Sequence, residues 1–212
     1  DPSEPTPIAN SAILLCFGSY KLGVATPSGD MDTLVLVPKY VDRKVHFFGI
    51  LYNMLETKSK DNEHITQLTK VDYEHSVTPL IKMEFYGVSV DMVYAAVDDV
   101  SALAGEIRAS GLSNRVNLYN DSNLLSPIMD DKMQRSYNGF RNAEMILNSM
   151  FSESERRQDA LVERRIYHFR MTLRCIKKIC DLNGLKENKF GYLGGITMAM
   201  LTAKVVQLFP NY

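Results

Sequence analysis

Short apolar runs bounded by turn residues dominate the first part of the chain. Ala12–Phe17 and Asp30–Val37 each predict a strand, and Gly18-Ser19 ends the first of them as a turn would. Leu80–Phe85 and Val88–Ala95 lie on either side of a two-residue turn signal, which predicts a β-hairpin. The pattern therefore predicts a sheet built from at least four strands.

A helical pattern interrupts these strands once. Lys44–Thr57 places Val45, Phe48, Tyr52 and Leu55 on one helical face. The charged residues 58–63 that follow predict a surface loop.

The second part of the chain has helical periodicity. Asn138–Phe151, Asp159–Leu182 and Ile196–Phe209 are predicted to be helices, and the change from strands to helices falls near residues 100–137. Strands that come before helices favour an α+β domain followed by a helical one.

The composition is that of an ordinary globular protein. The 212 residues are 45% hydrophobic and 23% charged, which excludes the disordered and fibrous classes. No apolar run approaches the roughly 18 residues of a membrane span, so we expect no membrane partner. The cysteines (16, 175 and 180) have no metal-like spacing and predict buried free thiols in a reducing, intracellular compartment. The four scattered histidines argue against a zinc site.

The charge is unevenly distributed. The formal net charge is −1, but residues 156–189 hold ten Lys or Arg against four Asp or Glu, so that segment is +6 and the remainder is −7. Basic helices commonly display arginine to solvent, but they also suit a triphosphate or an RNA strand.

Three aspartates have a spacing that suits metal chemistry. Residues at i and i+2 of a strand project from one face, so Asp30 and Asp32 are expected to converge. Asp91 lies in the otherwise apolar second strand of the predicted hairpin, where a carboxylate needs solvent, a partner or a cation. Three carboxylates on neighbouring strands would hold two Mg²⁺ or Mn²⁺ ions for nucleotidyl transfer.

A phosphate-binding turn precedes the aspartates. A glycine directly after a strand allows backbone to approach a phosphate closely, and Ser19 adds a hydroxyl donor. Gly-Ser or Asp-x-Asp alone is a weak signal. The ordered combination with a distant strand aspartate is the pattern of the nucleotidyltransferase β-like superfamily.

Several segments resemble eukaryotic canonical poly(A) polymerases. Cys16-Phe-Gly-Ser-Tyr-Lys-Leu-Gly-Val24 with Asp30-Met-Asp32 is similar to the family's opening motif, and residues 79–95 are similar to its strand pair with the third aspartate. Ser136-Tyr-Asn-Gly-Phe-Arg141, residues 173–177, residues 191–201 and Gln207-Leu-Phe-Pro-Asn211 resemble further elements of the family. The resemblance covers residues 13–212 almost completely.

The resemblance implies a set of site residues. Catalysis and metal binding would fall to Asp30, Asp32 and Asp91. Nucleotide contacts would involve residues around the first motif, on the helices and at the glycine turn, namely Phe17, Gly18, Ser19, Thr26, Asn138, Lys177, Lys186, Gly195 and Ile196. Asn138 matches a position near the sugar and base of ATP, and Lys177 matches a triphosphate-binding lysine.

The resemblance also implies a fold and an activity. The fold would be a palm-like mixed sheet with flanking helices at 11–136, preceded by an extended arm at 1–10 and followed by an incomplete helical central domain at 137–212. The family's C-terminal RNA-binding domain is absent from this sequence, so we expect a fragment or a reduced, divergent member. The activity would be template-independent transfer of AMP from ATP to an RNA 3′ end in the nucleus, with two metal ions and with cleavage and polyadenylation factors as partners.

One departure leaves base selectivity open. The family usually has a tyrosine where this chain has Lys186, which would remove an aromatic platform for the base. A related RNA nucleotidyltransferase with altered base choice is therefore an alternative. A non-catalytic RNA-binding or scaffold subunit is another.

Overall fold

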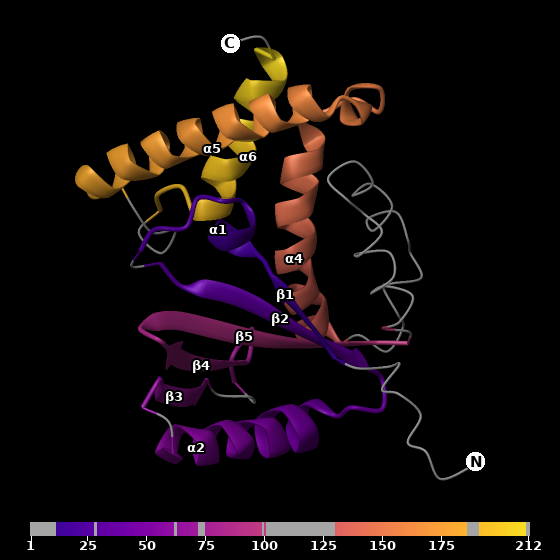
Figure 1. Cartoon of the computed structure of the whole chain (residues 1–212), viewed down its shortest axis with the longest axis vertical. Helices are drawn as coiled ribbons and strands as arrows, with labels where there is room; N and C mark the ends of the chain where they lie inside the picture. Colours follow the sequence, from indigo (N-terminus) through magenta and orange to yellow (C-terminus); the bar gives the residue numbers. More distant parts are fainter. Residues whose placement is uncertain are drawn as a thin grey trace.

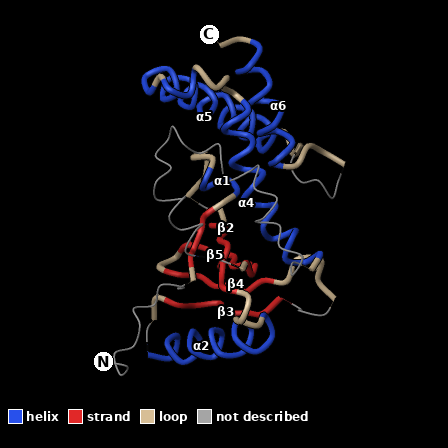
Figure 2. Tube along the Cα trace, turned by 90° about the vertical axis from the view of Figure 1, so that its right-hand side faces the viewer, coloured by secondary structure: helices blue, strands red, loops and turns tan. Residues whose placement is uncertain are grey.

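The computed structural model describes residues 12–27, 29–61, 63–71, 75–98, 100, 130–185 and 191–210. The arm predicted at residues 1–10 and Lys186 lie outside these residues. A mixed five-stranded sheet occupies the middle of the molecule, between α2 at one end and α5 and α6 at the other (Figures 1 and 2). The predicted α+β class, a mixed sheet with flanking helices, is confirmed.

The sheet has the strand order β1-β2-β5-β4-β3. Its strands are β1 (Ile13–Cys16), β2 (Met31–Pro38), β3 (Ile65–Val71), β4 (Leu80–Phe85) and β5 (Val88–Val97). β2 and β5 are parallel, and every other neighbouring pair is antiparallel. The parallel pair lies at the centre, so residues far apart in sequence meet there at the same end of their strands.

The predicted hairpin is confirmed, and one strand was missed. β4 and β5 pair from Phe85 with Val88 onwards, across the turn at Tyr86 and Gly87. β3 forms the far edge of the sheet beside β4. Its register shifts between Thr66 and Thr69, and Gln67 in between has a φ of +51°, so its side chains do not alternate regularly.

The predicted helix at 44–57 is a π-helix followed by an α-helix. η1 spans Arg43–Leu51 and α2 spans Tyr52–Asp61, so the expected charged loop at 58–63 was wrong over most of its length. A π-helix has wider turns than an α-helix, which changes the face that each side chain occupies. Phe47 and Phe48 are both buried against the sheet, while Val45 is exposed.

Helices cover both faces of the sheet. Residues of η1 and α2 pack on the alternate side chains Val90, Met92 and Tyr94 of β5. The opposite face, with Leu34, Leu36, Val93 and Ala95, packs against α4 (Asp131–Ser149). α4 begins seven residues before the predicted Asn138, because Asp130 caps it by accepting from the Met133 amide and also pairs with Arg43 of η1 at 2.6 Å.

The C-terminal helices form a second core with the C-terminal half of α4. α5 (Asp159–Leu182) matches its prediction, and α6 (Gly195–Leu208) begins one residue early. Leu147, Phe169, Leu173 and Ala199 lie in this core with residues of the loop after β1. The cavity described below lies where this core meets the sheet.

The chain's cysteines are free, as predicted, but none is fully buried, since Cys16 and Cys180 are only half-buried. Cys175 lies exposed on the outer side of α5, so its predicted burial was wrong. Over the described ranges, no helix has the length and apolar content required to cross a membrane.

Candidate active site

The turn after β1 encloses the Asp32 carboxylate. Gly18 begins the short helix α1 (Gly18–Lys21) with a φ of +58°, a left-handed conformation that side chains rarely adopt. A Cβ at Gly18 would overlap Oδ2 of Asp32, and the Phe17 amide donates to the Asp32 carbonyl at 2.9 Å. The glycine is therefore required both for the turn and for the close approach of this carboxylate.

Asp32 and Asp91 are neighbours in the parallel strand pair. They are register partners on β2 and β5, which places their Cα atoms on strands about 4.8 Å apart. Burial, together with the negative charges of Asp91 and Asp30, raises the pKa of Asp32 to about 6, although Lys82 opposes the shift. A carboxyl with a raised pKa beside two other carboxylates is a site that favours a cation.

Lys82 places a positive charge next to the strand aspartates. It is the register partner of Asp91 on β4, and its Nζ lies 3.1 Å from Asp91 Oδ1 and 3.8 Å from Asp30 Oδ2. Hydrogen bonding to Asp91, together with attraction to the three aspartates, outweighs partial burial and raises the pKa of Lys82. Sequence analysis missed this residue, yet a two-residue turn at 86–87 sets the register that brings it opposite Asp91.

Asp30 lies apart from the other two aspartates. It immediately precedes β2, and its side chain is 52% exposed, against 19% for Asp91. Across the part of the chain that the structure describes, no three His, Cys, Asp or Glu side chains stand close enough to hold a metal ion. The group at this point therefore consists of Asp32, Asp91 and Lys82, with Asp30 at its exposed edge. We call it the carboxylate cluster.

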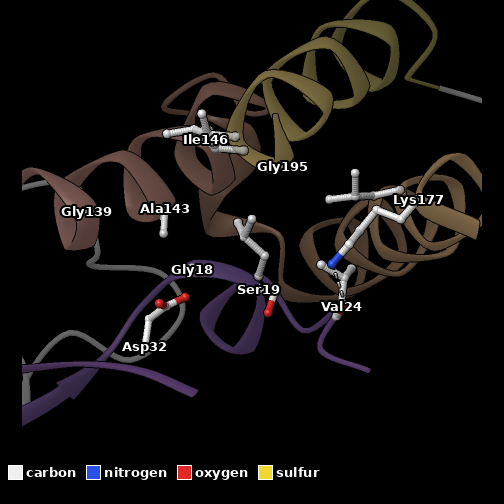
Figure 3. A pocket seen from close by; sticks show the side chains of 12 residues that line it. Gly18, Ser19, Val24, Asp32, Gly139, Ala143, Ile146, Lys177 and Gly195 are labelled. Carbon is white, nitrogen blue, oxygen red and sulfur yellow. Dashed lines mark hydrogen bonds between the residues drawn. The ribbon is translucent and has the colours of Figure 1, made fainter. Parts of the chain in front are cut away.

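Six of the sequence-predicted site residues line one cavity of about 270 Å³ (Figure 3). They come from the β1–α1 turn, from β2, from α5 and from the start of α6: Gly18, Ser19, Asp32, Lys177, Gly195 and Ile196. Leu22, Val24, Ala143, Ile146 and Leu173 give the cavity an apolar wall. The cavity therefore has a carboxylate at one side and an ammonium group at the other.

The remaining predicted residues do not line this cavity. Phe17 lies behind it, with its ring so close to α4 that a Cβ at Gly139 would be 2.8 Å from Cε2. Thr26 and Asn138 are exposed, Asn138 being the neighbour of the lining residue Gly139. Asp91 is the register partner of Asp32 on the neighbouring strand, and Asp30 lies 3.8 Å from Lys82 Nζ at the exposed edge of the carboxylate cluster.

Three basic side chains of α5 hold the loop that follows α1. Arg170, Arg174 and Lys177 donate to consecutive carbonyls, those of Leu22 at 3.1 Å, Gly23 at 2.6 Å and Val24 at 3.3 Å. Gly23 has a φ of +73°, and a Cβ there would overlap the Arg170 guanidinium. We call these three side chains the α5 clasp, and sequence analysis had anticipated only Lys177.

Part of the basic segment is structural. Arg165 is buried, donates to the Met150 carbonyl at 2.7 Å and pairs with Glu155 at 2.8 Å. Hydrogen bonds from Arg165 and from Ser152 lower the pKa of Glu155 to about 2. Arg157, Arg164 and Lys178 are exposed and therefore accessible to a ligand.

These features suit a phosphorylated ligand. The Ser19 hydroxyl and the Lys177 ammonium are hydrogen-bond donors of the kind that bind phosphate oxygens. Carboxylate oxygens beside them are the ligands that Mg²⁺ and Mn²⁺ prefer. The arrangement can orient a nucleoside triphosphate with its phosphates near a divalent cation.

Comparison with known proteins identifies two domain families along the chain. Residues 2–150 match the poly(A) polymerase nucleotidyltransferase domain, and residues 168–212 match the poly(A) polymerase central domain. The first match includes all three aspartates, and the second includes Lys177 and the start of α6.

The chain is also similar to individual poly(A) polymerases and to a solved structure. Nuclear poly(A) polymerase 4 of Arabidopsis thaliana is 34% identical over 201 residues, which is 95% of this chain and 23% of that protein. Poly(A) polymerase PAPa of Candida albicans is 34% identical over 198 residues, 93% of this chain and 30% of that protein. The polymerase core of TRAMP, an RNA surveillance complex, aligns with a TM-score of 0.45 at 17% identity, covering 94% of this chain and 44% of that one. The chain thus spans less than a third of the length of these two relatives.

Proposed function

Because the chain belongs to the poly(A) polymerase family, we propose that it transfers AMP from ATP to the 3′ end of RNA without a template and releases pyrophosphate. The observation that supports this most is the cavity in which Ser19, Asp32 and Lys177 come together from three separate segments. The strand aspartates, the turn donors and the helix lysine are the groups that this reaction uses.

The triphosphate would lie between the β1–α1 turn and α5. Ser19 and Lys177 would donate to phosphate oxygens, and Gly195 and Ile196 would border the nucleotide where α6 begins. Lys177 now donates to the Val24 carbonyl at 3.3 Å, so it would exchange or share this weak hydrogen bond when the nucleotide binds. Asn138 is proposed to lie near the sugar and base of the nucleotide, and Phe17 and Thr26 are proposed as further nucleotide contacts.

Divalent metal ions fit the carboxylate cluster. Oδ1 of Asp91 is buried, and the ammonium of Lys82 lies 3.1 Å from it. Asp32 beside it has a raised pKa, and both offer the hard oxygen ligands that Mg²⁺ and Mn²⁺ prefer. Asp30, Asp32 and Asp91 would hold two such ions, which supply Lewis-acid activation of the attacking hydroxyl and charge neutralisation at the phosphates.

Asp91 is proposed to orient the proton of the attacking hydroxyl. The 3′ oxygen of the RNA attacks the α-phosphorus of ATP, the α–β phosphoanhydride bond breaks, and pyrophosphate leaves with the electron pair. The Asp91 carboxylate is less exposed than that of Asp30, and one of its oxygens would accept the hydroxyl proton. Lys177 would offset the negative charge that develops on the leaving group.

The RNA would reach the site along exposed basic residues. Arg157, Arg164 and Lys178 are candidates for phosphate contacts, which would make binding strongly salt-dependent. The protein is proposed to act in mRNA polyadenylation in the nucleus with cleavage and polyadenylation factors, within a reducing compartment. The division into a catalytic domain ending at 136 and a helical central domain beginning at 137 stays a prediction, since α4 runs through that boundary.

Two alternatives have a specific basis. Lys186 in place of an aromatic residue favours a related enzyme with altered base choice. The ion pair between Lys82 and Asp91 would also suit a non-catalytic RNA-binding subunit, because the cluster is neutralised without a metal.

Primer extension separates these possibilities. The chain is incubated with an RNA primer, Mg²⁺ or Mn²⁺ and each of ATP, UTP, CTP and GTP in turn. We expect extension with ATP, and its loss by more than about 1,000-fold in Asp91→Asn. Asp98→Asn, an exposed position directly after the far end of β5, is the matched control and should retain full activity.

The other outcomes assign the alternatives. Preferred incorporation of another nucleotide would establish altered base choice. Equal extension by Asp91→Asn and by the unmodified chain would rule out the proposed mechanism.

A further inference from the structure

In the metal-free protein the carboxylate cluster contains the positively charged ammonium group of Lys82. The ammonium of Lys82 lies between Asp91 and Asp30, 3.1 Å and 3.8 Å from their oxygens, on the side of Asp91 opposite Asp32. Register fixes this row across three strands: Asp32 on β2, Asp91 on β5 and Lys82 on β4. Side chains paired in register project from the same face of the sheet, so all three point to the same side.

The charge of Lys82 compensates a repulsion that the fold imposes. The β2–β5 register holds Asp32 and Asp91 at directly opposite positions and directs both side chains to the same face of the sheet. Two carboxylates at directly opposite positions of neighbouring strands repel each other. An ammonium group in the cluster offsets this cost, and so would a divalent cation.

Lysine and a metal ion therefore compete for the same oxygens. Oδ1 of Asp91 is the buried carboxylate oxygen that pairs with Lys82 Nζ at 3.1 Å, and a carboxylate oxygen is also a ligand atom for a divalent cation. Lysine is suited to leave because its charge is carried on a long flexible stem, and the Lys82 side chain is 42% exposed.

We propose that Lys82 is a built-in counter-ion that occupies the cluster in the metal-free protein and is displaced when a divalent cation binds. This inference rests on the proposed function, because it takes the metal site to be that of Asp32 and Asp91. Because Lys82 competes with the metal ion, the affinity for the metal is lower than the carboxylates alone would give. In the metal-free protein, the same ammonium group keeps the Asp32 and Asp91 carboxylates in place.

The test is a Mn²⁺ titration of the whole chain, followed by the electron paramagnetic resonance of free Mn²⁺, without nucleotide or RNA. Lys82→Met should bind Mn²⁺ about 3- to 10-fold more tightly, because the competing charge of an ion pair is gone. Lys82→Gln should do the same. Lys82→Arg keeps the charge and should bind Mn²⁺ as the unmodified chain does.

Two controls make the result specific. Lys70→Met removes a lysine from β3 whose ammonium lies over the Tyr52 ring, and it should leave the affinity for Mn²⁺ unchanged. In thermal unfolding with EDTA, Lys82→Met should melt below the unmodified chain, and saturating Mn²⁺ should abolish the difference. A merely structural lysine would lower the melting temperature equally in both conditions.

Failure of this inference is distinct from failure of the proposed function. Unchanged or weaker Mn²⁺ binding by Lys82→Met, combined with weaker binding by Asp91→Asn, would overturn the counter-ion role and leave the metal site standing. Unchanged binding by Asp91→Asn would remove the metal site itself, and with it both proposals.

Discussion

The acidic and the basic sides of the cavity are positioned in different ways. The strand register fixes Asp32 and Asp91, so the acidic side is set by backbone hydrogen bonds on both neighbouring strands. The basic side depends on long side chains of α5, which reach the carbonyls of residues 22–24. The acidic side is therefore preorganised, whereas bonds on the basic side can be exchanged for bonds to a ligand.

The largest effect is expected from disturbing the preorganised side. Gly18→Ala would force a Cβ into the Asp32 carboxylate and strain a φ of +58°, so the carboxylate must move. A displacement of about 1 Å at reacting groups costs about 100-fold in rate, and steady-state primer extension would measure it. Gly184→Ala is the matched control, since its φ is +67° but nothing lies within 4 Å of the added Cβ. Equal losses in both variants would show that backbone strain alone is responsible.

A smaller effect is expected on the exchangeable side. Lys177→Met removes the ammonium from the cavity wall and should raise the KM for ATP about 10-fold, because a charged hydrogen bond to phosphate is lost. The adjacent Lys178 is exposed and does not line the cavity, so Lys178→Met should leave this KM unchanged. A KM for ATP that rises equally in both variants would contradict the placement of the triphosphate.

The α5 clasp should matter more for stability than for chemistry. Arg174→Met removes the 2.6 Å hydrogen bond to the Gly23 carbonyl and should cost about 1 kcal/mol of unfolding free energy. Urea denaturation measures this difference, with Arg164→Met, an exposed residue of the same helix, as the control. If Arg164→Met lowered the free energy of unfolding as much as Arg174→Met does, the hydrogen bond of the α5 clasp would contribute nothing beyond the effect of removing a positive charge from α5.

The smallest effect is a pH dependence of the metal-free protein. The pKa of Asp32 is about 6 in the folded state and near 3.8 when unfolded, so the folded state binds this proton more tightly. Stability is therefore lost as the pH rises through that window, and Asp32→Asn removes the loss. In EDTA at pH 7.5 the variant should be more stable by about 1 kcal/mol, less than the full shift implies because solvent screens a part-exposed group. The advantage should shrink towards pH 4, and thermal unfolding across that range measures it.

Much of the fold was predictable because its patterns are local. The β4–β5 hairpin and the 24 residues of α5 follow from periodicity and turn chemistry. β3 was missed since its bulge at Gln67 breaks the alternation of side chains. The early start of α4 depends on the bond from Arg43 to Asp130, a tertiary contact that no local pattern shows.

The candidate site was predictable in its residues but not in its arrangement. The motifs identified six of the residues that line the cavity. They gave no sign that Asp30 lies outside β2, or that Lys177 donates to a backbone carbonyl. Lys82 was overlooked because a lysine in an apolar strand is ordinarily a solvent-facing residue, and only the register opposite Asp91 gives it a partner.

The most direct test of the account is a crystal structure of the chain with Mn²⁺ and a non-hydrolysable ATP analogue, with manganese located by anomalous scattering. The account predicts manganese against the Asp32 and Asp91 carboxylates, with the triphosphate in the cavity between Ser19 and Lys177. Lys82 Nζ should then have left Asp91 Oδ1. Manganese bound elsewhere, or a nucleotide outside this cavity, would contradict it.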